Sequence, residues 1–584
     1  MVKLKNNSLH DDRASQIVSW GHWFALFNIF FVIIVGSRYL FIADWPQTLL
    51  GRVYAIISCI GHFSFLTFIV YLVLLFPLSF FLHSPKWQRI IAVIIATIAI
   101  TILLIDIEVF TKFRMHLNFS IWEILTSHDE NNIFSVEWQK LFIFVPLILL
   151  LETVFAIWSW RKLRSLSKRH RYARPVVITF VLCFVLSHLI HIWADANFYR
   201  PITMQRSSLP LSYPLTARHF LERYGFIEKG NYESRIRQEG NPFAIAIEYP
   251  LDKISYNPVK APYNILMIVV DDWQVNNQSS DERNAMPKLT TFAEQHSQFN
   301  NHYSASTQPF LGEFSLFYGL DPNYYDSILA GHKSSVFIDT LAKQRYNLGL
   351  FSSDGFDHPL YRYALLSNFS VPDKVQNKSY LATSDLWLAW YKEQSQLENP
   401  NPWFSIIQYK DNRQDHGVTQ AKELDKAIAK VLDTLQNSGE MDNTVIVITA
   451  GNTESSQNQS QFNREMLRVP LVIAWPHRAA EVITTPTSHV DIVPTLMADV
   501  LNVTTNSKQY SQGENLFSPN SRKWLIAGSE KDIAALYEDK TILIDNTGHY
   551  QVYDLANQLQ QNEKLGLSTF LQLVTENRRF MVTN

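Results

Sequence analysis

The chain has 584 residues, of which 18% are charged and 13% aromatic, and its formal net charge is −2. This composition, with only 19 glycines, excludes a disordered chain, a collagen-like fibre and a disulfide-rich secreted scaffold. The near-neutral charge argues against a generally basic nucleic-acid-binding protein, so we expect no nucleic-acid partner.

The first third of the sequence contains five apolar runs, and about 20 apolar residues are enough to span a bilayer core. The runs are Trp20–Val35, the charge-free stretch between Arg52 and Lys86, Ile90–Ile105, Leu141–Trp160 and Pro175–Trp193. They predict a five-helix transmembrane domain over residues 1–193. No cleavable signal peptide is evident, because the first run is too long and is followed by others.

The short loops predict the orientation, because Lys and Arg accumulate on the cytoplasmic side of a membrane. The loop RKLRSLSKRHRYAR (161–174) is strongly basic, and the N-terminus carries Lys3, Lys5 and Arg13. Both therefore belong in the cytoplasm. Five spans then leave the C-terminal part outside, which is the periplasm if the chain lies in the inner membrane of a Gram-negative cell.

A few polar residues fall within the predicted spans. Glu152 lies near the middle of the fourth, where a carboxylate is a candidate functional group. The alternative, a protonated or hydrogen-bonded helix-packing contact, is favoured because no basic residue is evident at the same depth. His188 and His191 lie near the outer end of the fifth span, with Asp195 just beyond, and we expect interface roles for them rather than a proton relay.

Residues 194–250 are predicted to form a periplasmic linker. Prolines interrupt its first half, and TARHFLERYG (216–225) predicts a short helix capped by Thr216 and ended by Gly225. A basic amphipathic helix just outside a membrane suits anionic headgroups, and a solvated helix joining two domains is the alternative. The residues expected to bind lipid are Thr216, Ala217, Arg218, His219, Phe220 and Leu221.

We expect the backbone N–H groups at the start of this helix to face a lipid phosphate. Arg218 would add a charge-assisted hydrogen bond, whereas a neutral His219 would contribute little charge at pH 7. Phe220 and Leu221 would lie against acyl chains.

Residues 251–584 alternate between strand and helix patterns. Continuous apolar runs predict strands buried on both faces, and helical segments such as Gln420–Leu435 lie between them. The strands are Asn264–Val270, Asn347–Ser353, Trp403–Tyr409, Thr444–Ala450 and Pro470–Trp475. This alternation predicts a doubly wound α/β domain with a mostly parallel central sheet, whose functional groups would lie at the carboxyl ends of the strands.

Polar residues follow several of these strands. They are Asp271–Asp272, Asp354 with His358, Asp415 with His416, and, in a later segment, His489 with Asp491. Adjacent carboxylates after a buried strand are hard-cation ligands in many hydrolases, although a turn or a helix cap explains the pair equally well.

Two sets of motifs carry a resemblance to known families. NILMIVVDDW, FNNHYSAS, VPLVIAWP and SHVDIVPTL resemble, in order, the sulfatase and alkaline-phosphatase superfamily over about residues 262–520. SWGHWFALFN, GSRYLFIADWP, GHFSFL, WADANFYRPITMQR and LPLSYPLTAR resemble the YejM/PbgA-like inner-membrane proteins, and that match runs through the whole chain. The architecture is also similar to that of lipoteichoic acid synthases and phosphoethanolamine transferases.

Active members of the superfamily combine a divalent metal with a Thr, Ser or formylglycine nucleophile. Counting from Phe299 and back from Gly319, the position that resembles the nucleophile holds Pro309, which has no nucleophilic side chain. Thr307 and Ser306 are nearby hydroxyls, but they would need a slip of two or three residues.

The metal-binding positions of the resemblance are only partly kept. The carboxylate after the first strand is present as Asp271, beside Asp272, but the Asp-His pair is replaced by Asn452 and Thr453. These losses predict very low metal affinity, and hence an outer domain that has lost its chemistry and needs no cofactor. Residual Mg²⁺ or Mn²⁺ binding, or an unorthodox site with His416 and His489, is the alternative.

The resemblance implies a regulator of lipopolysaccharide homeostasis. Such a protein would sense lipid A in the periplasmic leaflet and bind, through its transmembrane half, the membrane-anchored adaptor that delivers the lipid A deacetylase to a protease. It would hold the adaptor when lipid A is scarce and release it when lipid A accumulates. The alternatives are a cardiolipin-binding transporter and a metal-dependent phosphatase or headgroup transferase.

Overall fold

The computed structural model describes most of the chain in two compact units. The residues it describes are all except 1, 44, 83, 120, 123–134, 163–169, 227, 229, 271–272, 274–284, 370, 372–377, 411–417, 452–462, 519–521, 530, 546–547, 562 and 582–584. One unit consists mainly of Met1–Ser234 with Leu565–Thr575, and the other of Arg235–Lys564 with Glu576–Met581. The segment predicted as a linker is therefore shared between the two units.

The first unit contains five helices that are long and apolar enough to cross a membrane, and these confirm the predicted spans. The spans are Ser15–Ile42, Leu49–Phe81, Pro85–Lys112, Ile143–Arg161 and Ala173–Ala196. Their elements are α1 (Val2–Gly36), α2 (Arg38–Ile42), α3 (Leu49–Val70), the π-helix η1 (Tyr71–Leu75), α4 (Phe76–Phe81), α5 (Pro85–Phe113), α7 (Ser135–Arg161) and α9 (His170–Ala196).

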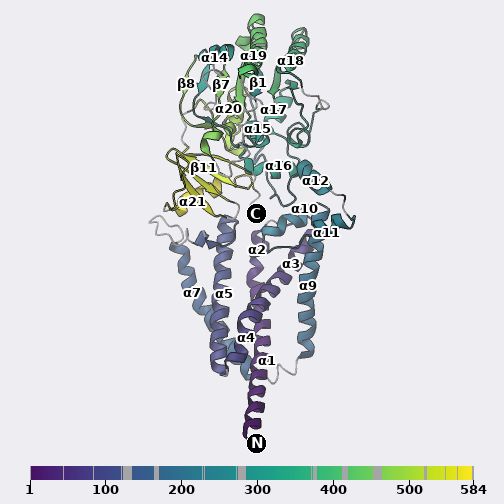
Figure 1. Ribbon diagram of the computed structural model, residues 1–584, viewed down its shortest axis with the longest axis vertical. Coiled ribbons are helices and arrows are strands. Elements are labelled where there is room, and N and C mark those ends of the chain that lie inside the picture. The colour runs from purple at the N-terminus through teal and green to yellow at the C-terminus, as the bar shows by residue number, and fades with distance from the viewer. Residues whose placement is uncertain are drawn as a thin grey trace. The chain divides into compact units, whose positions relative to one another are not determined.

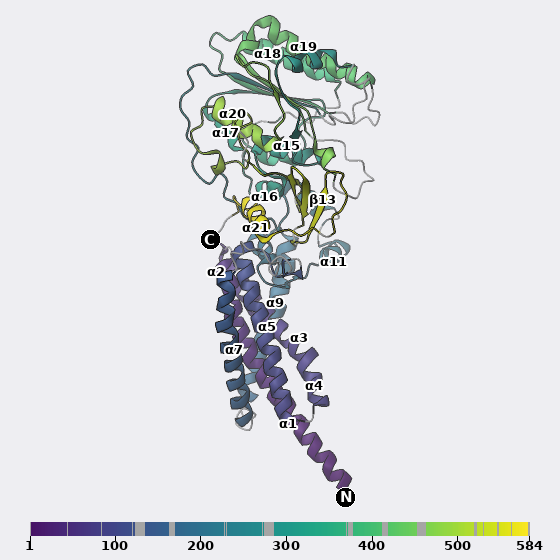
Figure 2. The ribbon, with the colours of Figure 1, turned by 90° about the vertical axis from the view of Figure 1, so that its left-hand side faces the viewer.

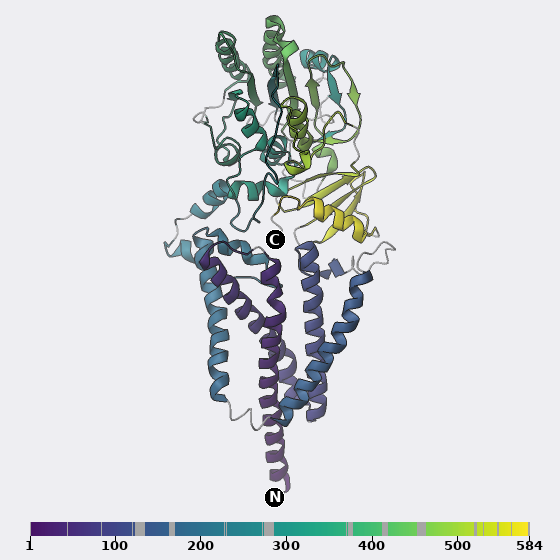
Figure 3. The same ribbon diagram turned by 180° about the vertical axis from the view of Figure 1, so that it is seen from behind.

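Helix α1 occupies the middle of this unit, with α3 and α9 on one side and α5 and α7 on the other (Figure 3). Gly36 allows α1 and α3 to approach closely, because a Cβ atom there would lie 2.3 Å from the ring of Phe63. Glu152 on α7 is fully buried and accepts a hydrogen bond of 3.2 Å from the Asn28 side chain on α1. Its observed contact is therefore one between packed helices.

Short elements follow the fifth span: α10 (Arg200–Thr203), the 3₁₀ turn η2 (Met204–Ser207), α11 (Arg218–Arg223) and α12 (Asn231–Glu239). Helix α11 begins one residue later than predicted, at Arg218. Its N-cap is Ala217, which makes no side-chain hydrogen bond to the helix, so the prediction that Thr216 caps it is wrong. The predicted end is close, because Gly225 directly follows the C-cap and takes a left-handed conformation with φ of 73°.

The second unit is built on a seven-stranded, mostly parallel sheet, as predicted. The strand order is β4 (Asn347–Ser352), β5 (Trp403–Tyr409), β1 (Asn264–Val270), β6 (Thr444–Ala450), β7 (Leu471–Ala474), β2 (Ser297–Phe299), β8 (Val482–Ile483). The first four strands are parallel, whereas β7 runs antiparallel to both β6 and β2.

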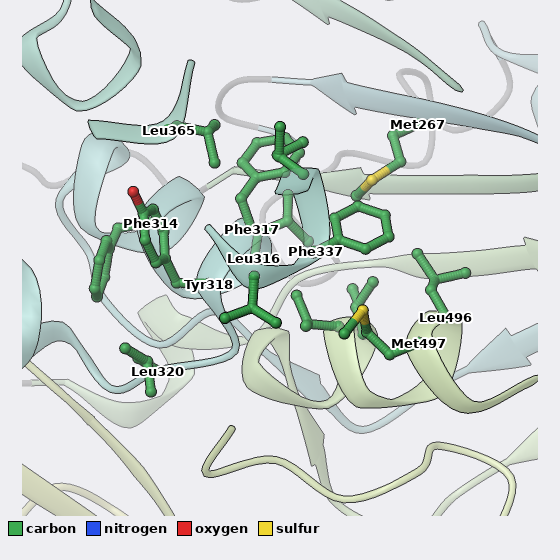
Figure 4. Close-up of a cluster of buried hydrophobic side chains, with 14 of the residues drawn as sticks. Met267, Phe314, Leu316, Phe317, Tyr318, Leu320, Phe337, Leu365, Leu496 and Met497 are labelled. Carbon is green, nitrogen blue, oxygen red and sulfur yellow. The ribbon is translucent and has the colours of Figure 1, made fainter. Parts of the chain in front are cut away.

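Helices cover both faces of this sheet, because its central strands are apolar on both sides (Figure 2). Ile265, Met267 and Val269 of β1 pack in one core and Leu266, Ile268 and Val270 in the other. The first core is formed with α15 (Pro309–Tyr318), α16 (Tyr325–Ala330), α17 (Val336–Lys343) and α20 (Ile492–Asp499), and part of it is drawn in Figure 4. The second is formed with α14 (Pro287–Glu294), α18 (Tyr380–Ser395) and α19 (Val418–Ser438).

A second sheet, which was not predicted, is an antiparallel meander of β10 (Trp524–Gly528), β11 (Ile533–Tyr537), β12 (Lys540–Ile544) and β13 (Tyr550–Asp554), seen in Figure 1. The remaining elements are short. They are β3 (His302–Tyr303) paired with β9 (Thr487–Ser488), η3 (Pro322–Tyr324), η4 (Leu360–Leu365), η5 (Glu440–Asn443), η6 (Arg464–Leu467), η7 (His489–Asp491), η8 (Ser507–Gln509) and α21 (Leu567–Glu576).

Candidate functional site

The segment 199–226, here called the collar, follows the C-terminal end of the fifth span. Six of its apolar side chains are unusually exposed, each by more than half of its surface. They are Leu211, Tyr213, Leu215, Phe220, Tyr224 and Phe226. Such a concentration of exposed aromatic and aliphatic groups marks a surface for a membrane or a partner, and aromatic residues are enriched where hydrocarbon meets headgroups.

Histidines on α3 and α9 hold the backbone of the collar. His62 on α3 donates from Nε2 to the carbonyl of Pro210 at 2.7 Å. The backbone of Leu215 is fixed from both sides: its N–H donates to Nδ1 of His188 at 3.2 Å, and its carbonyl accepts from Nδ1 of His191 at 3.2 Å. These contacts are to the backbone of the collar, and the prediction of membrane-interface roles for His188 and His191 stays a prediction.

A buried ion pair fixes the next turn of the collar. Asp195, at the end of α9, is 1% exposed and accepts two hydrogen bonds of 2.9 Å from Arg218. Tyr232 donates to the same carboxylate at 2.9 Å, and the guanidinium lies 4.0 Å from the centre of its ring. Burial and the Asp195 charge raise the pKa of Tyr232 well above its ordinary value. This arrangement satisfies a carboxylate that is otherwise costly to bury.

A cavity of about 340 Å³ lies beneath the strap formed by residues 211–215. Helix α3 contributes Tyr54, Ser58 and His62, and α9 contributes Ser187 and His188. The apolar side chains of Phe65, Leu66 and Phe184 line the rest. Histidine and hydroxyl groups toward the collar and apolar groups deeper in the bundle give this cavity the polarity gradient of an amphipathic ligand.

The collar differs in one important respect from the predicted lipid site. Arg218 was expected to meet a lipid phosphate, but both of its hydrogen bonds to Asp195 are internal. His219 and Phe220 are exposed, Leu221 and Ala217 are half-buried, and Thr216 is exposed. The side chains of this set that are most accessible to a lipid are therefore those of Thr216, His219 and Phe220.

In the second unit, Pro309 is the first residue of α15. Proline suits that position because its missing N–H has no intrahelical partner there. Ser306 is buried, and its hydroxyl accepts a hydrogen bond of 3.2 Å from the Gln308 N–H, whereas Thr307 is half-buried. The Ser306 hydroxyl is thus engaged in a local turn.

A buried charged cluster lies beside the ends of the central strands. Glu313 on α15 is fully buried and pairs with Lys410, which follows β5, at 2.9 Å. Glu313 also accepts a hydrogen bond from the hydroxyl of Tyr361, which in turn accepts one from the Gln408 side chain. The cluster places the Lys410 ammonium group against the buried Glu313 carboxylate. It lies at the carboxyl ends of the strands, where functional groups are found in α/β folds.

Two buried histidines lie under the start of α15. His489 donates from Nδ1 to the Gly312 carbonyl at 3.3 Å, and its ring centre lies 5.2 Å from that of His302. Within the described residues, neither Nε2 atom has a hydrogen-bond partner. Burial lowers the pKa of His489 to about 4 and that of His302 well below its ordinary value.

The remaining predicted site residues are only partly covered. Asp271, Asp272, Asp415, His416, Asn452 and Thr453 lie outside the described residues. Asp354 and His358 follow β4, and His358 stacks on Phe310 at 4.8 Å. Among the described residues there is no group of three or more His, Cys, Asp or Glu that could hold a metal ion, and the predictions about metal binding stay predictions.

Sequence reasoning missed His62, Tyr232, Glu313 and Lys410 as members of these sites. A signal existed for Glu313, because it is the one charge in the apolar helix PFLGEFSLFY, and such a charge is expected to have a buried partner. No local pattern singles out Tyr232 or Lys410, since their partners lie 37 and 97 residues away along the chain.

Comparisons with known proteins cover both units. A family model described as a domain of unknown function (DUF3413) matches residues 7–256, and a sulfatase model matches residues 263–421 and 415–500. Among solved structures, the chain is similar to an alkaline-phosphatase-superfamily protein from Vibrio parahaemolyticus, with a TM-score of 0.45 and 14% identity over 59% of this chain and 92% of that one. It is also similar to the lipoteichoic acid synthase LtaP from Listeria monocytogenes, with a TM-score of 0.40 and 12% identity over 56% of this chain and 94% of that one.

Full-length relatives give the family. The chain is 45% identical to the inner membrane protein YejM of Salmonella typhimurium over 583 residues, which covers 98% of each chain. It is 38% identical over 571 residues, or 96% of each chain, to an uncharacterized protein of Haemophilus influenzae. At this identity and coverage, the chain belongs to the family of the inner-membrane protein YejM.

Proposed function

We propose that this inner-membrane protein senses lipid A in the periplasmic leaflet. It would regulate lipopolysaccharide homeostasis through the membrane-anchored adaptor that delivers the lipid A deacetylase to its protease. The adaptor would bind the transmembrane half. The observation that carries the lipid part of this proposal is the cavity of about 340 Å³ beneath the strap 211–215.

The lining of the cavity supports an amphipathic ligand. His62, His188 and the strap backbone supply polar groups at its mouth, and Phe65 and Phe184 supply apolar surface below. The exposed Leu211, Tyr213 and Leu215 border it and would contact acyl chains. Because Arg218 is paired with Asp195, its role would be to position the collar. A lipid phosphate would contact the part of Arg218 that stays exposed.

The proposed orientation places the N-terminus in the cytoplasm and the sulfatase-like unit in the periplasm. It rests on the basic loop 161–174 and on the positive-inside rule. Labelling of a single cysteine from one side of the membrane tests it: in a chain with Cys59 and Cys183 replaced by serine, Leu211→Cys should react with a membrane-impermeant reagent in spheroplasts. Reaction only after lysis would reverse the orientation.

We expect a bulky substitution in the cavity to remove lipid A. Ser58→Trp should fill the space between α3 and α9 and lower the lipid A retained by the full chain in nanodiscs by about tenfold, equivalent to ~1.4 kcal/mol. Ile56→Trp is the matched control, because Ile56 lies on the same helix, is 46% exposed and does not line the cavity.

Equal retention in wild type and Ser58→Trp would place the lipid elsewhere. Repeating the measurement with cardiolipin distinguishes the two ligands. If the protein is a cardiolipin transporter, the Ser58→Trp variant would lose cardiolipin and keep lipid A.

For the sulfatase-like unit, we propose a pseudo-hydrolase. Support comes from Pro309 at the start of α15 and from the Glu313–Lys410 pair, which balances charge without a metal. The purified full chain should not hydrolyse a generic phosphate ester, with or without added Mn²⁺ or Mg²⁺. Metal-dependent hydrolysis that is abolished by Asp271→Ala would instead favour the phosphatase or transferase alternative.

A further inference from the structure

A second cavity lies among α1, α3 and α9, deeper in the membrane unit than the one beneath the strap. Its volume is about 320 Å³, which is within the range of ligand sites. Apolar side chains form nearly all of its lining, among them Leu26 on α1, Phe68 on α3, and Val177 and Val181 on α9. The polar exceptions are His22, Ser64 and Tyr71.

The hydroxyl of Tyr71 is the unusual feature of this cavity. The side chain is only 3% exposed, and within the described residues its hydroxyl has no hydrogen-bond partner. The hydroxyl lies close to Gly21, where a Cβ atom would be 3.2 Å away. An unpaired buried hydroxyl costs free energy, so the geometry points to a ligand that brings a hydrogen-bond acceptor to this depth. Tyr71 also begins the π-helix η1, and π-helical turns often mark functional sites.

The neighbours of Tyr71 on the other two helices indicate its depth, and this depth indicates the kind of acceptor. Tyr71 itself belongs to a 33-residue span, longer than a bilayer core needs, and lies ten residues from its end at Phe81. Gly21 lies six residues into the first span, which begins at Ser15, and Val177 lies four residues into the fifth, which begins at Ala173. At about 1.5 Å per residue, these positions are roughly 6–9 Å from the end of each span. At this depth, near the headgroups, the hydrocarbon core adjoins the ester groups of glycerophospholipids. The carbonyl oxygens of these esters accept hydrogen bonds.

A cation lies on the same side of α9. Arg174 is exposed and precedes Val177 by three residues and Val181 by seven, so it continues the helix face that lines the cavity. A guanidinium at the end of a span is well suited to a phosphate, which it can bind through two parallel hydrogen bonds.

We propose that this cavity binds one glycerophospholipid from the leaflet on the N-terminal side of the spans. Its ester carbonyl would accept a hydrogen bond from Tyr71, its phosphate would lie at Arg174, and one acyl chain would fill the cavity. The chain would end at Phe65 and Phe184, whose stacked rings, 4.4 Å apart, line both this cavity and the one beneath the strap. A partner helix, about 10–12 Å in diameter, is too thick to enter the cavity and reach the hydroxyl.

This site goes beyond the proposed sensing of lipid A, and its ligand belongs to the other leaflet. The proposed function enters only through the orientation, which decides whether that leaflet is the cytoplasmic one. A failure of the lipid A experiment would therefore leave this proposal standing, and the reverse also holds.

The test uses the full chain reconstituted in vesicles of phosphatidylethanolamine and phosphatidylglycerol in equal parts, followed by native mass spectrometry of retained phospholipid. Val181→Trp should fill the cavity and remove one retained phospholipid. Ile178→Trp is the control, because Ile178 is 57% exposed against 55% for Val181, lies on the same helix and does not line the cavity. Tyr71→Phe should weaken retention about twofold to tenfold, as expected for one hydrogen bond, and Arg174→Gln should weaken it further for phosphatidylglycerol.

The proposal would be overturned if Val181→Trp retained as much phospholipid as the wild type, or if Ile178→Trp lost as much as Val181→Trp. In either case the retained phospholipid would belong to the general lipid shell around the protein. Full retention by Tyr71→Phe would also overturn it. If Val181→Trp weakens binding of the adaptor while phospholipid retention is unchanged, the cavity receives a partner side chain and the lipid assignment is wrong.

Discussion

Replacing Arg218 with alanine should destabilise the collar by about 2–4 kcal/mol. Breaking a buried ion pair by removing one partner typically costs ~3–5 kcal/mol, and we lower the figure because Arg218 is 33% exposed and partly screened by solvent. The loss arises because Asp195, 1% exposed, would keep its charge but lose two hydrogen bonds of 2.9 Å. Hydrogen exchange of the amides in residues 199–226 of the full chain measures the effect.

Two variants separate charge from geometry. Tyr232→Phe removes only one of the hydrogen bonds to Asp195 and should cost about 1 kcal/mol. The double variant Asp195→Asn with Arg218→Gln removes both charges and should be more stable than Arg218→Ala alone. Unchanged exchange in Arg218→Ala would mean that the ion pair does not hold the collar, and the arginine would again be available to a lipid phosphate.

Acid should destabilise the sulfatase-like unit through its buried histidines. Because burial lowers the pKa of His489 to about 4, the unfolded chain takes up a proton below pH ~6.5 while the folded chain does not. Stability is therefore complete above pH 6.5 and falls as the pH decreases toward 4, by about 3 kcal/mol for this one group. His302 contributes in the same direction, as does His358, whose pKa burial lowers to about 4.

Asp321 opposes this trend. Burial raises the pKa of this carboxyl to about 7. Between pH 7 and 4 the folded chain therefore binds a proton that the unfolded chain does not. The stability contributed by Asp321 thus increases as the pH falls through that window. His489→Gln should thus flatten the acid loss of stability, whereas Asp321→Asn should steepen it, each by up to ~1.4 kcal/mol per pH unit. Urea unfolding of the full chain in nanodiscs, followed through exchange of the β1 and β6 amides, gives the two slopes. Slopes that change in the same direction would refute the assignment.

Much of the fold could be predicted because burial leaves a direct pattern. The five spans and the central strands are long apolar runs, and the structure places them within a few residues of the prediction. The direction of β7 could not be predicted, because a strand buried on both faces has the same apolar composition whether it runs parallel or antiparallel to its neighbour. The meander over residues 524–554 was missed for a different reason: its strands are only five residues long and only partly buried, so they leave no long apolar run.

The sites were less predictable than the fold, because they depend on which side chains the fold brings together. The sequence TARHF indicated a basic turn near the membrane, but nothing local shows that Arg218 pairs with Asp195, which lies in a different helix. In the same way, Glu313 lies in α15 whereas Lys410 follows β5, and the two meet only in the folded unit. Thr216 was expected as a helix cap from its residue type, yet the helix begins at Arg218, where the ion pair to α9 fixes the chain.

The central claim is that lipid A in the collar controls the adaptor, and one measurement tests it directly: the affinity of the purified adaptor for the full chain in nanodiscs with and without lipid A. The account predicts that lipid A weakens adaptor binding about fivefold or more, as expected for coupled sites, and that Ser58→Trp abolishes this difference while Ile56→Trp preserves it. Equal adaptor affinity with and without lipid A in the wild-type chain would contradict the account.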